Sequence, residues 1–220
     1  MRKKVELQQK PHLEVELPIP TESDVHYKYI KWVKYARECM VYGIGNDGKV
    51  GLFWKKPSKH KPQNLNKRVG SVNVYGYRMI VTVKNGTIYE HQLVWLLFNG
   101  NLPSKPFSID HKDRDPQNNN IDNLRIANQK QQQRNKNARK DGKSRYTGVH
   151  WNKQHNKWRV HYYYVDENKN TKCVYIGAYK SEQFAALMWN FHVTGTSDFD
   201  EDFQNLNPIE PLIDLKLNQL

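Results

Sequence analysis

Residues 105–136 alternate short apolar runs with polar segments in an order that constrains the fold more than any other part of the chain. The apolar residues at 107–110 predict one strand, and those at 124–127 predict a second, after a loop rich in Asn and Asp. A polar run over 128–136 follows, with Asn128 as a favourable helix N-cap. The order of strand, loop, strand and helix predicts a small α+β unit with His111 at the end of its first strand.

The polar side chains on this frame suit metal-assisted hydrolysis of a phosphodiester. The neutral imidazole of His111 can accept a proton from water that attacks phosphorus. The Asp110 carboxylate offers a hard oxygen to Mg²⁺, and Gln132 can aim its carbonyl oxygen at the same ion from the helix. Asn123 can join the two ends of the loop by hydrogen bonds and so fix the imidazole. A catalytic site with one divalent cation, Mg²⁺ or Mn²⁺, is therefore expected here.

The charge of the chain favours a polyanionic partner. It carries 35 Lys and Arg against 22 Asp and Glu, a formal net charge of +13, and its pI is near 9.6. Nucleic acid is the usual partner of such a protein, although a generic basic surface is the alternative. We expect double-stranded DNA rather than RNA, because no exposed aromatic RNA-binding motif is present.

Membrane insertion and secretion are not expected. No apolar run approaches the length of about 18 residues that a membrane span needs. Residues 1–4 are basic but are not followed by the apolar region of a secretion signal. Cys39 and Cys173 are the only cysteines and cannot form a four-cysteine zinc site. The sequence predicts an intracellular protein with free thiols.

A longer pattern resembles the HNH endonuclease family and, within it, the phage and intron-encoded homing endonucleases. The resemblance lies in His91 with Val94-Trp95, in Ile109-Asp110-His111, and in residues 120–125. It extends upstream to residues 75–78, which are similar to the family's Gly-Tyr-Arg strand. The resemblance implies a ββα-metal core over about 105–138 and hydrolysis of DNA by a site-specific homing endonuclease. If a phage encodes the protein, it is expected to act in the cytoplasm of the host cell.

The same resemblance implies roles for individual residues. It makes His111 the general base, Asp110 a metal ligand, and Asn123 the residue that fixes the loop. The helix position that is His or Asn in the family falls on Gln132, which has the right ligand atom but one more methylene. Asn128 and Asn135 are the alternative ligands. His91 either supports the metal site or lies in the core at the start of a helix over 91–98, and we favour the core.

A second resemblance covers residues 144–195. Three strand-like segments, at 148–151, 158–164 and 173–179, precede a helix-like segment at 181–192. Residues 147–151, 157–160 and 175–179 resemble the Apetala/ethylene-response-factor DNA-binding domain, which lays a three-stranded antiparallel sheet, backed by one helix, in the major groove. By that match the candidate DNA contacts are Arg145, His150, Trp151, Lys153, Lys157 and Arg159, whereas Gly177, Ala185 and Ala186 are structural.

The expected organisation has five segments. They are a mobile arm at 1–24, an HNH nuclease domain at 25–138, a basic linker at 139–145, a sheet-plus-helix DNA-binding domain at 146–207 and a tail at 208–220. Helical spacing of Phe184, Leu187, Met188 and Phe191 predicts that these residues form the core face of the last helix. Further phosphate contacts are expected from Arg125, Lys130, Arg134, Lys136, Arg139 and Lys140.

Two questions about the whole chain stay open at this level. One predicted site per chain favours a monomer, but the apolar tail residues can support a weak homodimer. The alternative to an endonuclease is a DNA-binding regulatory protein that keeps a catalytically impaired HNH scaffold.

Overall fold

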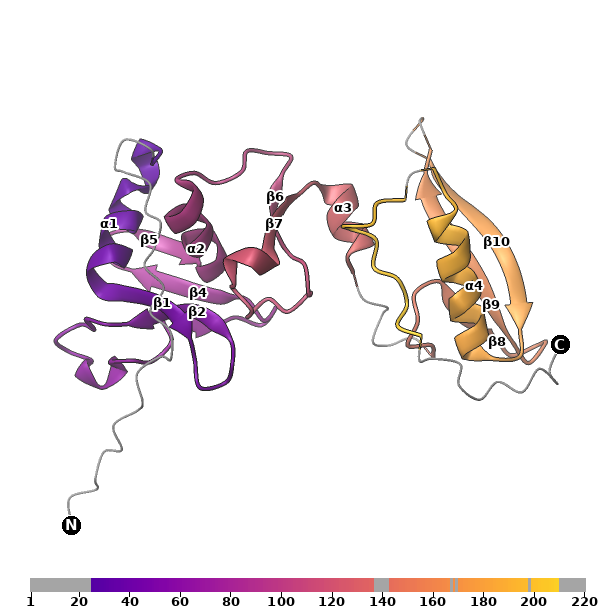
Figure 1. The fold of residues 1–220 in the computed structure, drawn as a ribbon, viewed down its shortest axis with the longest axis horizontal. Coiled ribbons are helices and arrows are strands. Elements are labelled where there is room, and N and C mark those ends of the chain that lie inside the picture. The colour runs from indigo at the N-terminus through magenta and orange to yellow at the C-terminus, as the bar shows by residue number, and fades with distance from the viewer. Residues whose placement is uncertain (1–24, 137–142, 167, 169, 198, 210–220) are drawn as a thin grey trace, which may run out of the picture. The chain divides into compact units, whose positions relative to one another are not determined.

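The computed structural model describes residues 25–136, 143–166, 168, 170–197 and 199–209. The chain divides between Gln132 and Gln133 into two compact units, each described by itself (Figure 1). The predicted arm at 1–24, Arg139 and Lys140 of the predicted linker, and all but the first two residues of the predicted tail lie outside the described residues. Among the helices that are described, none has the length and apolarity needed to cross a bilayer.

The first unit is built around two helices that pack side by side (Figure 1). In α1 (Ile30–Cys39), Trp32, Val33 and Ala36 are buried, in line with the helical spacing of the sequence. In α2 (Glu90–Asn99) six residues are buried, and the helix ends at Gly100 in the left-handed conformation, with φ of 73°. The predicted buried helix over 91–98 is therefore confirmed.

Small antiparallel sheets surround these helices. The first is a hairpin of β1 (Met40–Ile44) and β2 (Val50–Trp54), and the second has the order β3-β4-β5, from β3 (Ser71–Val72), β4 (Arg78–Thr82) and β5 (Gly86–Tyr89). β4 and β5 pair as a hairpin, and Gly86 at its turn has the left-handed φ of 82° that a glycine allows. Both sheets contact α2, which gives the unit one core.

The segment singled out in the sequence folds as strand, loop, strand and helix. Its elements are β6 (Ser108–His111), β7 (Leu124–Ala127) and α3 (Gln129–Arg134), and α3 is shorter than the predicted run over 128–136. Asn128 caps α3 as predicted, since its Oδ1 accepts a hydrogen bond from the Gln131 backbone N–H at 3.0 Å. In the β6–β7 register, Asp110 pairs with Arg125 and His111 with Leu124.

The second unit is a three-stranded antiparallel sheet with one helix against it. The strand order is β10-β9-β8, from β8 (Val149–Asn152), β9 (Lys157–Val165) and β10 (Thr171–Tyr179), and α4 (Glu182–Thr194) lies across one face of this sheet (Figure 1). The predictions of a mixed α+β chain and of these elements are confirmed. Gly148, with φ of 75°, lets the sheet approach α4, because a Cβ there would lie 2.2 Å from the Trp189 ring.

The predicted core face of α4 is wrong. Phe191 is 72% exposed, and Phe184, Leu187 and Met188 are only half-buried. The buried face instead consists of Ala185, Ala186, Trp189 and Val193. The small side chains of the two alanines allow the helix backbone to lie close to the sheet, and the Trp189 indole then fills the space above Gly148.

Candidate active site

His111 lies at the end of β6 with a buried imidazole, only 5% exposed. Its Nε2 is 2.9 Å from Oδ1 of Asn119 in the loop that follows. The Asn119 amide has a fixed orientation, because its Nδ2 donates a hydrogen bond of 2.6 Å to the Glu90 carboxylate. Nε2 of a neutral His111 therefore carries the hydrogen, and the lone pair is on Nδ1.

Asn119 is held at four points and is fully buried. Besides the two side-chain hydrogen bonds, its backbone N–H donates to the Val50 carbonyl at 3.1 Å, and its carbonyl accepts from the Tyr42 hydroxyl at 3.3 Å. The Tyr42 hydroxyl in turn accepts from the Ile121 backbone N–H at 2.8 Å. Burial raises the pKa of Tyr42 to about 12, so this hydroxyl stays protonated. The loop therefore presents a fixed acceptor to the imidazole.

Glu90, at the start of α2, anchors this arrangement from the core. Its side chain is fully buried and forms an ion pair with Arg68 at 2.9 Å, and its Oε1 accepts from the Leu52 backbone N–H at 2.7 Å. Gly51 makes room for the pair, because a Cβ there would lie 2.5 Å from Oε1 of Glu90. A buried carboxylate with a cation and several donors keeps its geometry, since any change would leave a charge unpaired.

Aromatic rings line the site beside His111. The His91 ring lies 5.3 Å from that of His111, and Tyr77 lies 6.0 Å from His111 and 5.5 Å from His91, measured between centroids. The Tyr89 ring stacks on His91 at 5.5 Å. Burial, with a further contribution from His111, lowers the pKa of His91 to about 3. His91 is thus both a core residue at the start of α2 and a neutral neighbour of the imidazole.

Asp110 directly precedes His111 in β6 and is paired with Arg125. The Arg125 Nε lies 3.0 Å from Asp110 Oδ2, as the direct pairing of the two residues across β6 and β7 allows. Gln132 donates its amide N–H to the Ser108 hydroxyl. Because Ser108 and Asp110 alternate with Ile109 along β6, they share one face of the strand. Gln132 therefore lies over the face from which Asp110 projects.

The Asp110 carboxylate and the Gln132 amide oxygen fit a hard divalent cation that keeps most of its bound water molecules. Within the described ranges, no group of three or more His, Cys, Asp or Glu side chains is placed to hold a metal ion. Mg²⁺ needs no such group, because it commonly binds one or two carboxylates and takes its other ligands from water and phosphate oxygens. Asp110 would provide the carboxylate for such an ion, and Gln132 would provide an amide oxygen on the same strand face.

Asn123 joins the two ends of the loop between β6 and β7. Its Nδ2 donates to Asp113 Oδ1 and to the Asn118 carbonyl, each at 2.9 Å, and its Oδ1 accepts from the Asp113 backbone N–H at 3.0 Å. The side chain hydrogen-bonded to the imidazole is Asn119. Asn123 therefore shapes the loop, and Asn119 contacts the base.

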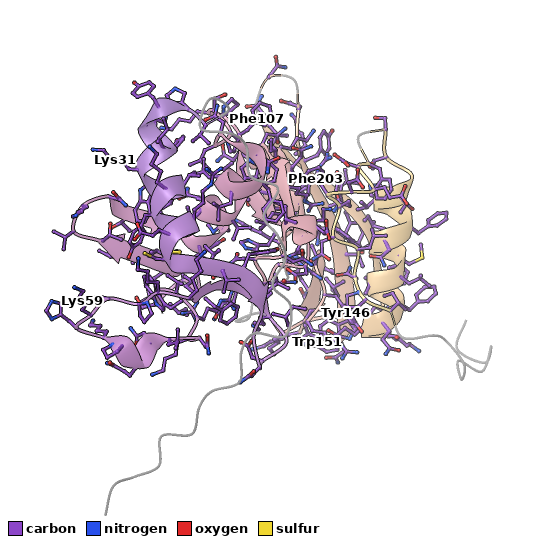
Figure 2. The ribbon with its side chains drawn as sticks, turned by 60° about the vertical axis from the view of Figure 1, so that its left-hand side comes forward. Lys31, Lys59, Phe107, Tyr146, Trp151 and Phe203 are labelled. Atoms are coloured by element: carbon purple, nitrogen blue, oxygen red, sulfur yellow. The ribbon has the colours of Figure 1, made fainter. Side chains whose placement is uncertain are left out.

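The predicted DNA contacts in and near the first unit differ in their exposure. Arg125 is mostly buried in its pair with Asp110, whereas Lys130 and Lys136 are exposed and Arg134 is half-buried. Figure 2 shows two further exposed cations outside the set of predicted contacts, Lys31 on α1 and Lys59 after β2. Positive charge in this unit is thus not confined to the segment around His111.

The sheet of the second unit has one face against α4 and one outer face. His150 and Arg159 pair across β8 and β9 on the outer face, where His161, Tyr163 and Tyr175 follow. Lys153 and Lys157 are exposed, and Arg145 is exposed with its guanidinium over the Tyr146 ring. Trp151 pairs with Trp158 at 4.9 Å on the face that carries Val149 and Val160. Among the predicted contacts on the strands, Trp151 is therefore on the side of the helix.

Two residues that hold the base, Asn119 and Glu90, are not among those predicted from the sequence. Asn119 is one of three consecutive Asn residues, and only the path of the loop decides which of them meets the imidazole. Glu90 offered a signal, because a carboxylate at the start of an otherwise apolar helix needs a buried partner.

Comparison with known proteins identifies the segment that contains this site. Residues 88–134 match the family model of the HNH endonuclease, so the chain contains an HNH endonuclease domain there. The chain is also 39% identical over 70 residues to Protein 3.8 of Escherichia phage T7. That alignment covers 32% of this chain and 57% of the phage protein. No solved structure matches the chain.

Proposed function

We propose that this protein is a metal-dependent DNA endonuclease that acts as a site-specific homing endonuclease. The observation that carries the proposal is the buried His111 imidazole, which directly follows Asp110 in β6, has its Nε2 fixed by Asn119 and lies inside the HNH segment. The β6–β7–α3 order supports a ββα-metal arrangement of that segment. The net charge of +13 supports a DNA substrate.

His111 acts as the general base in this proposal. Nδ1 takes a proton from the attacking water, while Asn119 holds the ring through Nε2. The imidazolium formed is stabilised through the Asn119 amide, which is itself polarised by the Glu90 carboxylate. His91 stays neutral, so it adds no positive charge that would oppose proton uptake. Asp110 and Gln132 would hold Mg²⁺ or Mn²⁺, and a cation bound there would supply positive charge to stabilise the phosphate and the leaving 3′ oxygen.

Cleavage is expected to depend on a divalent cation, and this dependence tests the proposal. Supercoiled plasmid should be nicked or linearised by the wild-type protein with Mg²⁺ or Mn²⁺, should stay intact with EDTA, and should be cut again after excess Mg²⁺ is restored. Replacing Gln132 by Ala should raise the Mg²⁺ concentration needed for half-maximal cleavage. Undiminished cleavage in EDTA would contradict the metal assignment. If Gln132→Ala needs the same Mg²⁺ concentration as wild type, the second metal ligand would be Asn128 or Asn135 instead.

The second unit is proposed to bind DNA with the outer face of its sheet. That face carries Arg159 and His150 next to each other, with the aromatic side chains of His161, Tyr163 and Tyr175 beyond them. A sheet can read base edges in the major groove through side chains on one face. In this proposal the first unit cuts the DNA and the second unit recognises the DNA sequence.

Arg159→Ala is expected to weaken binding to a target duplex by about 1–3 kcal/mol, if its guanidinium reads a guanine. Binding to a random duplex of equal length should change much less, because lost base contacts reduce discrimination rather than general affinity. The measurement is a pair of binding titrations at one salt concentration, on a duplex selected by the wild-type protein and on the random one. Equal weakening on both duplexes would show that Arg159 contacts phosphate instead of a base.

Two observations favour a different function, a DNA-binding regulatory protein with an impaired HNH scaffold. Arg125 occupies Oδ2 of Asp110, and Gln132 stands where the resembled family has His or Asn. A guanidinium on the metal-binding carboxylate competes with a cation for the same oxygen. The plasmid assay separates the two functions, because a regulator binds DNA without cutting it.

A further inference from the structure

Tyr77 lies beside the reacting groups but has no part in holding them. Its ring packs against Tyr89 at 5.9 Å and against His91 and His111, and the side chain is 37% exposed. Its hydroxyl has no hydrogen-bond partner among the residues that the structure describes. Nε2 of His111 and the Asn119 amide are already hydrogen-bonded to protein groups, whereas the Tyr77 hydroxyl can still donate a hydrogen bond to a ligand.

The backbone of Tyr77 is fixed by a tight turn that precedes β4. The Asn73 backbone N–H donates to the Tyr77 carbonyl at 2.8 Å, and the Asn73 side chain accepts from the Tyr75 and Tyr77 backbone N–H groups at 2.9 and 3.0 Å. Gly76, with φ of 86°, permits the turn. A donor on a backbone held in this way is preorganised, since it loses little freedom when a ligand arrives.

The electrostatic surroundings keep the hydroxyl a donor. Burial, and after it the negative charge of Asp110, raises the pKa of Tyr77. The phenol therefore remains protonated over the range in which a neutral imidazole can act as base. An anionic oxygen is the acceptor that such a hydroxyl binds most strongly.

We propose that the Tyr77 hydroxyl donates a hydrogen bond to a non-bridging oxygen of the phosphate that is cut at His111. This inference rests on the proposed endonuclease function and adds a group that touches the substrate. Tyr77 positions and stabilises the phosphate while His111 activates the water. The hydrogen bond strengthens as negative charge accumulates on the phosphate oxygens, so its loss slows the cleavage step more than it weakens binding.

Tyr77→Phe tests the proposal, because it removes only the hydroxyl and keeps the ring packing. At saturating DNA carrying the wild-type cut site, the single-turnover rate should fall roughly 10- to 100-fold, with affinity changed only a few-fold. Tyr75→Phe is the matched control, since it makes the same change on the same turn at a side chain that is 79% exposed. That control should cut at the wild-type rate.

Sulfur substitution at the scissile phosphate separates a direct contact from a packing effect. Wild-type protein and Tyr77→Phe are each assayed on the two phosphorothioate isomers. For the isomer whose sulfur replaces the contacted oxygen, the rate penalty should be smaller in Tyr77→Phe than in wild type. A wild-type rate in Tyr77→Phe, or equal penalties in both proteins for both isomers, overturns the role of Tyr77. A wild-type protein that cuts no DNA overturns the endonuclease function itself, and the role of Tyr77 with it.

Discussion

Replacing His111 by Ala should lower the single-turnover rate of DNA cleavage by about 10²- to 10⁴-fold, the usual contribution of a general base. DNA affinity should stay within a few-fold of wild type, because the imidazole acts on water and is almost entirely buried. The measurement is cleavage of a labelled duplex at saturating protein, together with a binding titration in EDTA.

His60→Ala is the control for this change, since His60 is an exposed histidine of the same unit. It should cut at the wild-type rate. Because His111 is buried, thermal unfolding of His111→Ala must also be recorded, to show that the variant is folded at the assay temperature. A folded His111→Ala that cleaves within a factor of about two of wild type would remove the imidazole from the reaction.

Glu90→Gln is expected to have the largest effect on stability. The substitution removes the charge that compensates the Arg68 guanidinium, in a pair whose side chains are 0% and 9% exposed. Breaking a buried ion pair at one partner typically costs about 3–5 kcal/mol, a large share of the stability of a domain. The free energy of unfolding from urea denaturation should fall by that amount, and cleavage should fall as well, because Asn119 loses its carboxylate partner.

Glu38→Gln provides the comparison for Glu90→Gln. Glu38 is also paired with a cation, Lys56 at 3.0 Å, but both side chains are more than half exposed. An exposed pair contributes little, so this variant should unfold like wild type. If Glu90→Gln and Glu38→Gln had equal stability, the buried network would not be what holds the first unit together around the site.

The sequence predicted the elements of the site better than their contacts. The alternation of apolar and polar residues located β6 and β7, and Asn128 identified the start of α3. It did not reveal that Asp110 and Arg125 are directly opposed, because register depends on the path of the whole loop. Nor could it select Asn119, whose position is set by hydrogen bonds to Val50 and Tyr42, far away in the sequence.

The buried face of α4 was predicted wrongly for a similar reason. Two apolar stripes run along this helix, one through Phe184, Leu187 and Phe191 and one through Ala185, Trp189 and Val193. Helical periodicity fits both, and the larger side chains favoured the first. The sheet selects the second, since small residues permit close approach and Gly148 leaves room for the Trp189 indole. Which face of α4 is buried therefore depends on Gly148, which lies outside the helix. The periodicity of the helix sequence alone contains no information about that residue.

Cleavage in ¹⁸O-labelled water tests the central claim most directly. Wild-type protein, plasmid DNA and Mg²⁺ or Mn²⁺ are incubated in that water, and the ends of the cut strands are analysed by mass spectrometry. Attack by a water activated at His111, with the 3′ oxygen leaving, predicts 3′-hydroxyl ends and one ¹⁸O on each new 5′-phosphate. Intact plasmid with either cation, or 5′-phosphates without ¹⁸O, would contradict the assignment of this site as a hydrolytic nuclease centre.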